Sequence, residues 1–566
     1  MRNKGTAVLS LLIWVLCLPL HAQWLTHESV LNNHTWYKIG VTEDGVYAID
    51  YATLQSLGVD VQSLNPGRIR LFGNAPGLLP EGNSEDRYDD LSEIAILVTG
   101  SENGMFDADD RILFYANGPV NMKLNIMDFF DYERNPFSDT LYYFLCLDSD
   151  ASGLRMQTRP LLQTTPEIPV ITSYLDYICH ESEEVSPYAS GRTWYGDVIT
   201  GQEGYKEFDF DVSDLDTSKP LWIDTKELGR CKETFSFNLK INDSIVVDSF
   251  AFAGYRDREF GKEHAVKRPK RVLSSPIRLR YEINPNSSNP MLFIDYFTLA
   301  FWRGLKFRNH ETGFRVIPSQ IDGTVKVQVG NAYDGVNCWE VTDPLNPAVQ
   351  QVELQSNILS FGIVDSVEHR YHLFDNSGLK QIASITPIHH QNLHGINDAE
   401  LLIITPRVFW DQSEALAEFH REMDAMNCVL VDVNEIYNEF GTGIPDPTAI
   451  RDFIRMVYLR SNGNLKYVLL MGKGTHDFRR LKGMDNNFVP TYQLLSSPHL
   501  EVYSLCSDDY YALMDEEEGR SCDGQVDLGV GRLPITTPEQ GDAMLEKIRH
   551  YSDLSKVMAG GKTIIF

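Results

Sequence analysis

The distribution of apolar and polar residues divides the chain into two parts. Between residues 23 and 390, short alternating or apolar runs are separated by Gly, Pro, Asn and Asp, which is typical of strands joined by tight turns. Asp-Gly pairs at 44–45 and 322–323 favour such turns, because glycine readily adopts a positive φ. The pattern predicts two or three β-sandwich-like domains. The clearest predicted strands are residues 36–41, 94–98, 112–115, 141–145, 235–241 and 325–329.

From Asp398 onward the pattern changes to alternating strands and helices. Helices are predicted after Asp411, where Glu414 completes a capping box, after Asp446-Pro447, and after Thr537. This order, with right-handed crossovers, predicts a mostly parallel sheet. The fold class is therefore mixed: β-rich, sandwich-like N-terminal domains followed by an α/β subdomain. The predicted strands are residues 400–405, 428–433, 467–471 and 526–533.

The same changes suggest a division of the chain. It comprises a signal peptide (1–22), a β-rich domain (23–165), a β-sandwich-like domain (166–310), a β-rich domain (311–390), a linker (391–399), an α/β subdomain (400–558) and a last apolar segment (559–566). Arg2 and Lys4, the apolar stretch 7–20 and a cleavage site after Ala22 together predict export. No internal apolar run reaches the length of a membrane-spanning helix.

Composition narrows the classes of function. The 566 residues carry 50 basic and 79 acidic side chains, so the net charge is −29 and a basic, nucleic-acid-binding surface is not expected. Seven cysteines remain after the signal peptide, without Cys-x-x-Cys pairs or zinc-type spacing. This odd, scattered set predicts single buried thiols, with neither a disulfide framework nor a structural metal.

Two loops follow predicted strands at the edge where parallel sheets bind ligands. The candidate residues in them are Lys473, His476, Asp508 and Asp509. The first loop lacks the upstream Gly of a P-loop, and a role in shaping loops is favoured for both. Cys506 and His476 are the one pair from which a catalytic dyad could be assembled here.

Asp107, Asp109 and Asp110 form a candidate calcium site, since three carboxylates within four residues are able to converge on a hard cation. The glycine and the final glutamate of an EF-hand loop are missing, so a solvated acidic turn is the favoured interpretation. The adjacent pair His389-His390 is interpreted as part of a polar linker, because neighbouring imidazoles point in different directions.

Several segments resemble a known family. The stretch from Glu400 to about Tyr551 resembles the first subdomain of the gingipain-type cysteine peptidases (peptidase family C25), which have a caspase-like α/β fold. Upstream segments resemble the long N-terminal region of type IX secretion sortases of Bacteroidetes. A departure from the family is Lys473, where members often carry an acidic residue. The segments are 401–405, 437–440, 449–451, 467–472, 507–511 and 530–534, and upstream 36–38, 43–47, 69–74, 190–196 and 339–344.

The resemblance implies covalent catalysis by a Cys/His dyad located in a second caspase-like subdomain. It implies an exported, outer-membrane-associated sortase at the cell surface that removes C-terminal secretion signals from cargo proteins. The cargo would then be attached to anionic lipopolysaccharide, together with other type IX secretion components of the outer membrane. No cofactor is required, and calcium is an option at the acidic turn.

Neither part of the family's dyad is found in the sequence. The one His-Gly pair, His394-Gly395, lies before the first α/β strand, and no cysteine follows an alanine. We therefore expect the dyad beyond Phe566, with 559–566 as the start of the second subdomain and the chain as given inactive. Alternatives are a secreted gingipain-like endopeptidase and a non-catalytic surface adhesin.

Overall fold

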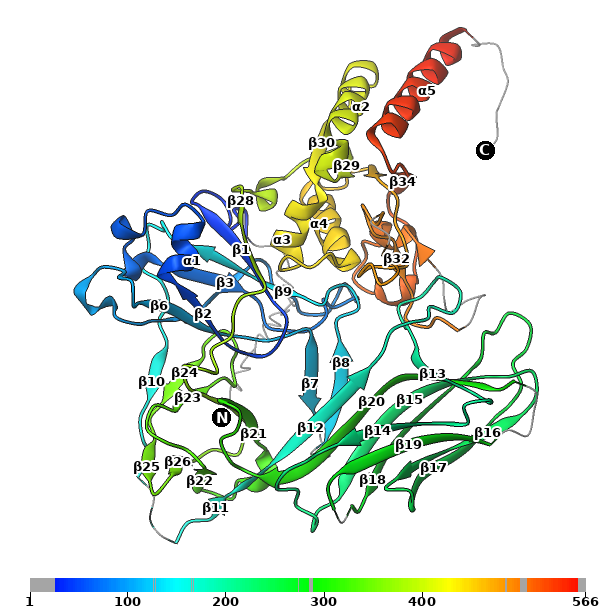
Figure 1. The fold of residues 1–566 in the computed structure, drawn as a ribbon. Helices are drawn as coiled ribbons and strands as arrows, with labels where there is room; N and C mark the ends of the chain where they lie inside the picture. Colours follow the sequence, from blue (N-terminus) through cyan, green and yellow to red (C-terminus); the bar gives the residue numbers. More distant parts are fainter. Residues whose placement is uncertain are drawn as a thin grey trace, which may run out of the picture.

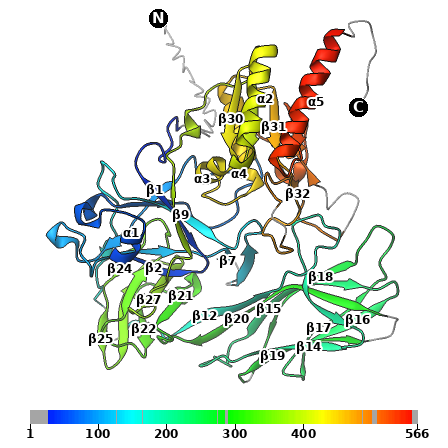
Figure 2. The same ribbon diagram turned by 45° about the horizontal axis from the view of Figure 1, so that its top comes forward.

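The computed structural model describes residues 26–557, except 126, 128, 164, 166, 273, 285–288, 484–485 and 499–505. The predicted signal peptide and the predicted start of a second subdomain lie outside the described residues. Figures 1 and 2 show several β-rich bodies from the first two thirds of the chain, with an α/β part above them that ends in α5. The predicted mixed fold class is confirmed.

The first β-rich body contains two antiparallel sheets around a core that includes Ile39, Leu71 and Phe114. The 94–98 run, predicted as one strand, is divided between these sheets, because its first residue pairs with β3 (Arg70–Gly73) and its last two with β6 (Arg111–Ala116). One sheet has the order β28 (Ser384–Ile388), β1 (Trp36–Val41), β9 (Leu141–Cys146), β3 (Arg70–Gly73) and β4 (Ser92–Ile94), and the other β2 (Gly45–Asp50), β6 (Arg111–Ala116) and β5 (Leu97–Val98). Helix α1 (Tyr51–Ser56) follows β2, and β7 (Val120–Leu124) and β8 (Phe130–Arg134) form a hairpin.

The second body is a sandwich whose long strands extend to the lower right in Figure 1. Strict alternation explains it: in β16 every second residue, from Phe235 to Ile241, is buried. One sheet has the order β12 (Ser173–Glu181), β20 (Met291–Gly304), β15 (Leu221–Arg230) and β18 (Lys262–Lys270), with β13 (Gly196–Thr200) also on β20. The other contains β14 (Tyr205–Phe210), β19 (Ile277–Asn284), β16 (Phe235–Ile241) and β17 (Ile245–Phe252).

The third body also consists of two sheets, and its strand pairing joins segments assigned to different predicted domains. The early strands β10 (Gln157–Arg159) and β11 (Val170–Ile171) pair in parallel with β24 (Ala348–Gln350) and β22 (Val325–Gly330). In the first body, the late strand β28 pairs with β1. One sheet has the order β10 (Gln157–Arg159), β24 (Ala348–Gln350), β23 (Asn337–Glu340), β27 (His369–Phe374) and β21 (Glu311–Val316). The other has β11 (Val170–Ile171), β22 (Val325–Gly330), β26 (Ile358–Ile363) and β25 (Glu353–Gln355).

The α/β part is built on a four-stranded parallel sheet, as the sequence predicts. Its strand order is β30 (Cys428–Asp432), β29 (Leu401–Thr405), β31 (Tyr467–Met471) and β34 (Gly529–Leu533). The helices are α2 (Trp410–Met423), α3 (Val433–Phe440), α4 (Pro447–Arg460) and α5 (Pro538–Val557). Alternate residues of β29 enter two cores: Leu402 and Ile404 pack with α3 and α4, and Leu401 and Ile403 with α2 and α5.

Local signals located most of these helices. Asp446 caps α4, since its carboxylate accepts the Thr448 N–H at 2.8 Å. The prediction that Asp411 is an N-cap is wrong: α2 begins at Trp410, and Asp411 lies in its first turn. Helix α3 was not predicted. The remaining short elements are the pair β32 (Tyr492–Gln493) and β33 (Cys506–Ser507) and 3-10 turns at Val61–Ser63, Pro66–Arg68, Ser101–Asn103, Pro318–Gln320, Leu393–Gly395, Arg407–Phe409, Asp509–Ala512 and Arg520–Cys522.

Candidate functional site

A cavity of about 590 Å³ lies at the carboxyl ends of the parallel strands, where sheets of this kind bind ligands. Pro406 after β29 and Val433 after β30 line it from the sheet side. Phe488, in the loop after β31, closes it further, and Lys38 and Tyr142 come from the first β-rich body. The cavity is therefore formed by two parts of the chain that are far apart in sequence, residues 38–142 and residues 406–490.

Lys38 is the most unusual group in this cavity. Its ammonium donates to the Asn438 side-chain oxygen at 3.0 Å and to the Gly443 carbonyl at 2.9 Å. It also lies 4.2 Å from the centre of the Tyr142 ring. Burial lowers the pKa of Lys38 to about 7, because none of these partners carries a compensating negative charge. Such an amine is suited to proton exchange at neutral pH or to holding an anion.

The close approach of Lys38 depends on Gly443. This residue has φ +84°, and a Cβ there would lie 2.9 Å from Lys38 Nζ and 2.8 Å from Tyr142 Cβ. Nothing in the spacing of residues 36–41 marks Lys38 as special, because its partners lie in and just after α3. Sequence reasoning therefore missed it.

The charge at the edge of the cavity is largely neutralised. Arg479 forms an ion pair with Asp139 at 2.8 Å and another with Glu183. Arg134 contacts the same Asp139 at 2.8 Å. The network joins the segment after β8, the segment after β12 and the loop after β31, so it holds three parts of the fold around the site.

The four loop candidates do not line this cavity. The side chain of Lys473 is exposed. The ring of His476 stacks on Trp194, with centroids 5.6 Å apart and an interplanar angle of 10°, and burial lowers its pKa. Asp509 is exposed, and its backbone N–H donates to Ser507 Oγ at 3.1 Å.

Asp508 is held by an arginine. Arg532 binds both of its carboxylate oxygens at 2.7 Å, and it also donates to the carbonyls of Gly472 at 2.8 Å and Val489 at 2.6 Å. Through these contacts Arg532 joins the segment after β31 to the loop that carries Asp508, at the carboxyl edge of the sheet. Asp508 therefore acts here on loop geometry.

The segment 190–196, which comes from the sandwich side, covers these loops. The backbone N–H groups of Arg192 and Thr193 donate to the carbonyls of Leu494 and Leu495 at 3.0 and 3.1 Å. Ser190 Oγ lies 3.2 Å from the sulfur of Cys506, and the ring of Trp194 stacks on the ring of His476. The structure thus gives Cys506 and His476 separate partners from the same covering segment.

The other cysteines have surroundings that suppress thiolate chemistry. Burial raises the pKa of both Cys146 and Cys179 to about 12, and a protonated thiol is a poor nucleophile. Cys231 is buried in the sandwich core. Burial also raises the pKa of the thiols of Cys338, Cys428 and Cys522.

The acidic turn at 107–110 is organised by its own hydrogen bonds. The Asp110 carboxylate accepts the Asp107 N–H at 2.7 Å, and the Asp107 carboxylate accepts from Asn103 at 2.6 Å. Asp109 points to solvent. A calcium site here stays a prediction.

Comparisons with known proteins identify the α/β part. Residues 395–566 match the model of peptidase family C25. The chain is also similar to the crystal structure of dimeric latent PorU from Porphyromonas gingivalis, with TM-score 0.79 and 22% identity over 95% of this chain and 52% of the PorU chain. It thus spans about half the length of that PorU.

Other comparisons add little. A CBM36 carbohydrate-binding module in complex with calcium and xylotriose matches 22% of this chain and 98% of its own, with 11% identity and TM-score 0.15, which is too low to carry an argument. No curated protein matches the chain. Among the described residues, no helix has the length and apolarity needed to cross a membrane. The chain therefore has a fold similar to that of PorU, and its residues 395–566 match the model of peptidase family C25.

Proposed function

We propose that the chain works as a sortase of the type IX secretion system. In this role it removes the C-terminal secretion signal from exported cargo proteins and transfers the cargo to an amine on anionic lipopolysaccharide. The observation that carries the proposal is the C25 match at 395–566 in a chain whose fold follows PorU over 95% of its length. The protein would act at the cell surface, with other type IX components of the outer membrane as partners.

The proposed chemistry is that of a cysteine peptidase. A thiolate attacks the scissile carbonyl, an imidazole transfers the protons, and backbone N–H groups stabilise the oxyanion. The acyl-enzyme then passes to the lipopolysaccharide amine instead of to water. The described cysteines favour a reacting thiol outside the described residues, because six of them are buried or carry a raised pKa and the exposed Cys506 faces a serine. We propose that residues 26–557 position the cargo and that a dyad outside them reacts.

The cavity around Lys38 fits this positioning role. It opens at the carboxyl edge of the sheet and offers an amine, aromatic surface and backbone carbonyls to a peptide. Its volume of about 590 Å³ is within the range of small-ligand sites and suits one or two side chains.

The test is deletion of the encoding gene in the source bacterium, followed by mass spectrometry of a secreted cargo. The sortase proposal expects cargo that retains its C-terminal signal and has no lipopolysaccharide attached. A labelled amine offered to cells with the intact gene is expected to be incorporated at the new carboxyl terminus.

Two other outcomes separate the alternatives. Cargo that is cleaved in the wild type only to free carboxyl termini, without amine incorporation, would favour a gingipain-like endopeptidase. Unchanged cargo in the deletion strain, with loss of adhesion to a surface, would favour a non-catalytic adhesin.

A further inference from the structure

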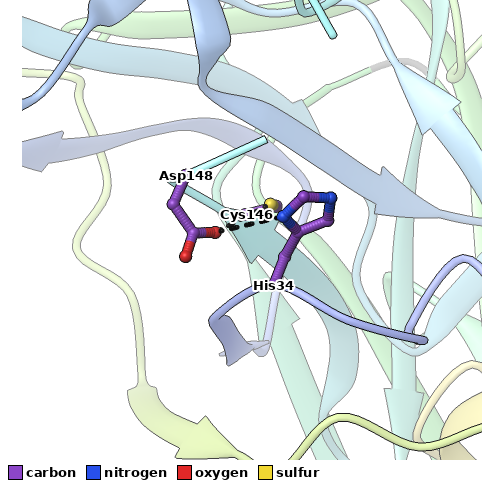
Figure 3. Close-up of side chains that lie close together, drawn as sticks. All are labelled: His34, Cys146 and Asp148. Carbon is purple, nitrogen blue, oxygen red and sulfur yellow. Dashed lines mark hydrogen bonds and ion pairs between the residues drawn. The ribbon is translucent and has the colours of Figure 1, made fainter. Parts of the chain in front are cut away.

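Three side chains of different chemistry converge where the chain enters β1. His34 lies in the preceding turn, and Cys146 and Asp148 lie at the end of β9 (Figure 3). The antiparallel register explains the meeting: Trp36 pairs with Cys146, so residues just before β1 face residues just after β9. One nitrogen, one sulfur and one oxygen from the three side chains lie within 4.8 Å of one another.

We propose that His34 Nδ1, Cys146 Sγ and an oxygen of Asp148 bind a zinc ion, with water as the fourth ligand. The sulfur lies 3.6 Å from Asp148 Oδ1, and His34 Nδ1 lies 3.8 Å from the same oxygen. Tetrahedral zinc with ordinary bond lengths separates S and O by about 3.6 Å and N and O by about 3.4 Å. The S–O separation is already met and the N–O separation needs a small movement of the imidazole. The S–N separation, which lies within 4.8 Å, would close to about 3.6 Å in the same movement.

The kinds of donor atom in the cluster favour zinc over calcium and magnesium. Imidazole nitrogen and thiolate sulfur suit zinc, whereas calcium and magnesium take oxygen ligands. Three protein ligands with a remaining position for water is a common zinc arrangement. Zinc spacing is not visible in the sequence because residues 34 and 146 are brought together only by the β1–β9 pairing.

Neighbouring groups orient the ligands as they do in known metal sites. Thr35 donates to the Asp148 carboxylate twice, from its backbone N–H at 3.0 Å and from its hydroxyl at 2.8 Å. Carboxylates that bind metals in proteins are commonly held in place by such hydrogen bonds.

Exposure gives a cation a path to the site. The side chain of His34 is 29% exposed and that of Asp148 51%, whereas Cys146 is 1% exposed and forms the floor. Zinc binding forms a Zn–S bond and releases the thiol proton to solvent, so no other reactant is needed. A bound ion would fix the turn before β1 to the end of β9.

The experiment uses the full chain, stripped with a chelator and titrated with Zn²⁺ or Co²⁺. We expect one ion per chain, a thiolate-to-cobalt charge-transfer band in the near ultraviolet, and a rise in melting temperature with Zn²⁺. Cys146→Ala is expected to abolish the band. His34→Ala, on a partly exposed turn, tests the site without disturbing the core, and it should remove stoichiometric binding. Thr35→Val, which leaves all three ligands, should weaken affinity about tenfold.

Matched controls distinguish this site from adventitious binding. Cys506→Ala removes an exposed thiol, and His420→Ala removes a histidine that is paired with Asp424 at 2.7 Å. Both should leave the band and the stoichiometry unchanged. The proposal is overturned if the wild-type chain gives no thiolate band, or if the band survives Cys146→Ala or His34→Ala.

Discussion

Nδ1 of His394 lies 2.5 Å from a carboxylate oxygen of Glu439, and neither side chain is exposed to solvent. The same carboxylate accepts the backbone N–H groups of Leu393 and His394, at 2.8 and 3.1 Å. The other ring nitrogen of His394 contacts the Asp89 carbonyl at 2.7 Å, and the ring stacks on Phe440. The His-Gly pair before the α/β part thus ties that part to the first β-rich body.

Glu439→Gln is expected to destabilise this junction by about 3–5 kcal/mol, because removing one partner leaves a buried charge or donor unmatched. Hydrogen exchange measured by mass spectrometry should show faster exchange in α3 and in residues 391–396. The control is Glu353→Gln, at an exposed position on β25, which should change nothing. Equal exchange in both variants would contradict a stabilising role for the pair.

Lys38 predicts a specific dependence of stability on pH. Its pKa is about 7 in the folded protein, against an ordinary value of 10.5. Between these values the unfolded chain binds more protons, so the Lys38 contribution makes stability rise with pH, by up to about 1.4 kcal/mol per pH unit. Below about pH 7 both states are protonated and the contribution is constant.

In Lys38→Met this rise should be absent. The stability of the variant relative to the wild type is therefore expected to be highest near pH 7 and to fall toward pH 10. Thermal melts over this range measure the difference, with Lys466→Met, an exposed position, as the control that keeps a constant offset. Parallel curves for Lys38→Met and the wild type would rule out a buried, proton-releasing amine.

Arg532→Lys is expected to loosen the carboxyl edge of the sheet, because lysine cannot hold both oxygens of Asp508 and two backbone carbonyls at once. The expected cost is about 2 kcal/mol. The matched control is Arg278→Lys, where Arg278 binds both oxygens of Asp209 at 2.7 and 3.2 Å on the exposed sandwich surface. Exposed ion pairs contribute little, so the control should lose much less stability than Arg532→Lys.

Limited digestion with chymotrypsin measures the consequence at Arg532. Faster cleavage in the 473–490 loop is expected in Arg532→Lys alone. If the two arginine variants are equally resistant, the Arg532–Asp508 contact does not hold the loops.

Short-range patterns were enough wherever a residue's role is decided by its neighbours in sequence. The alternation in 235–241 gave β16 at its observed bounds, and Asp446-Pro447 located the start of α4. Helix α3 was missed because Asn438 and Glu439 are polar and yet buried, which obscures its apolar face. Its polar residues are buried because they satisfy Lys38 and the 391–395 turn, contacts that sequence spacing does not encode.

The candidate site shows the same limit. His476, Asp508 and Asp509 lie in loops that follow β31 and β33, but the cavity depends on Lys38 and Tyr142 from a different body. The zinc-type cluster likewise needs the pairing of β1 with β9. The positions of the loops can be predicted from local strand signals. Which side chains meet in space depends on tertiary packing, which the local pattern does not encode.

Cys506 gives a direct test of where the reacting thiol lies. A dyad needs the imidazole within hydrogen-bond reach of the sulfur, but Cys506 Sγ faces Ser190 Oγ at 3.2 Å and the His476 ring is stacked on Trp194. Cells that carry Cys506→Ala or His476→Ala should therefore process cargo within about twofold of the wild-type rate, since removal of a true nucleophile costs orders of magnitude. Purified chain of residues 23–566 should show no peptidase activity. Loss of cargo processing in Cys506→Ala, with the protein folded and abundant at the surface, would place the nucleophile on β33. It would refute the proposal that a dyad outside residues 26–557 reacts.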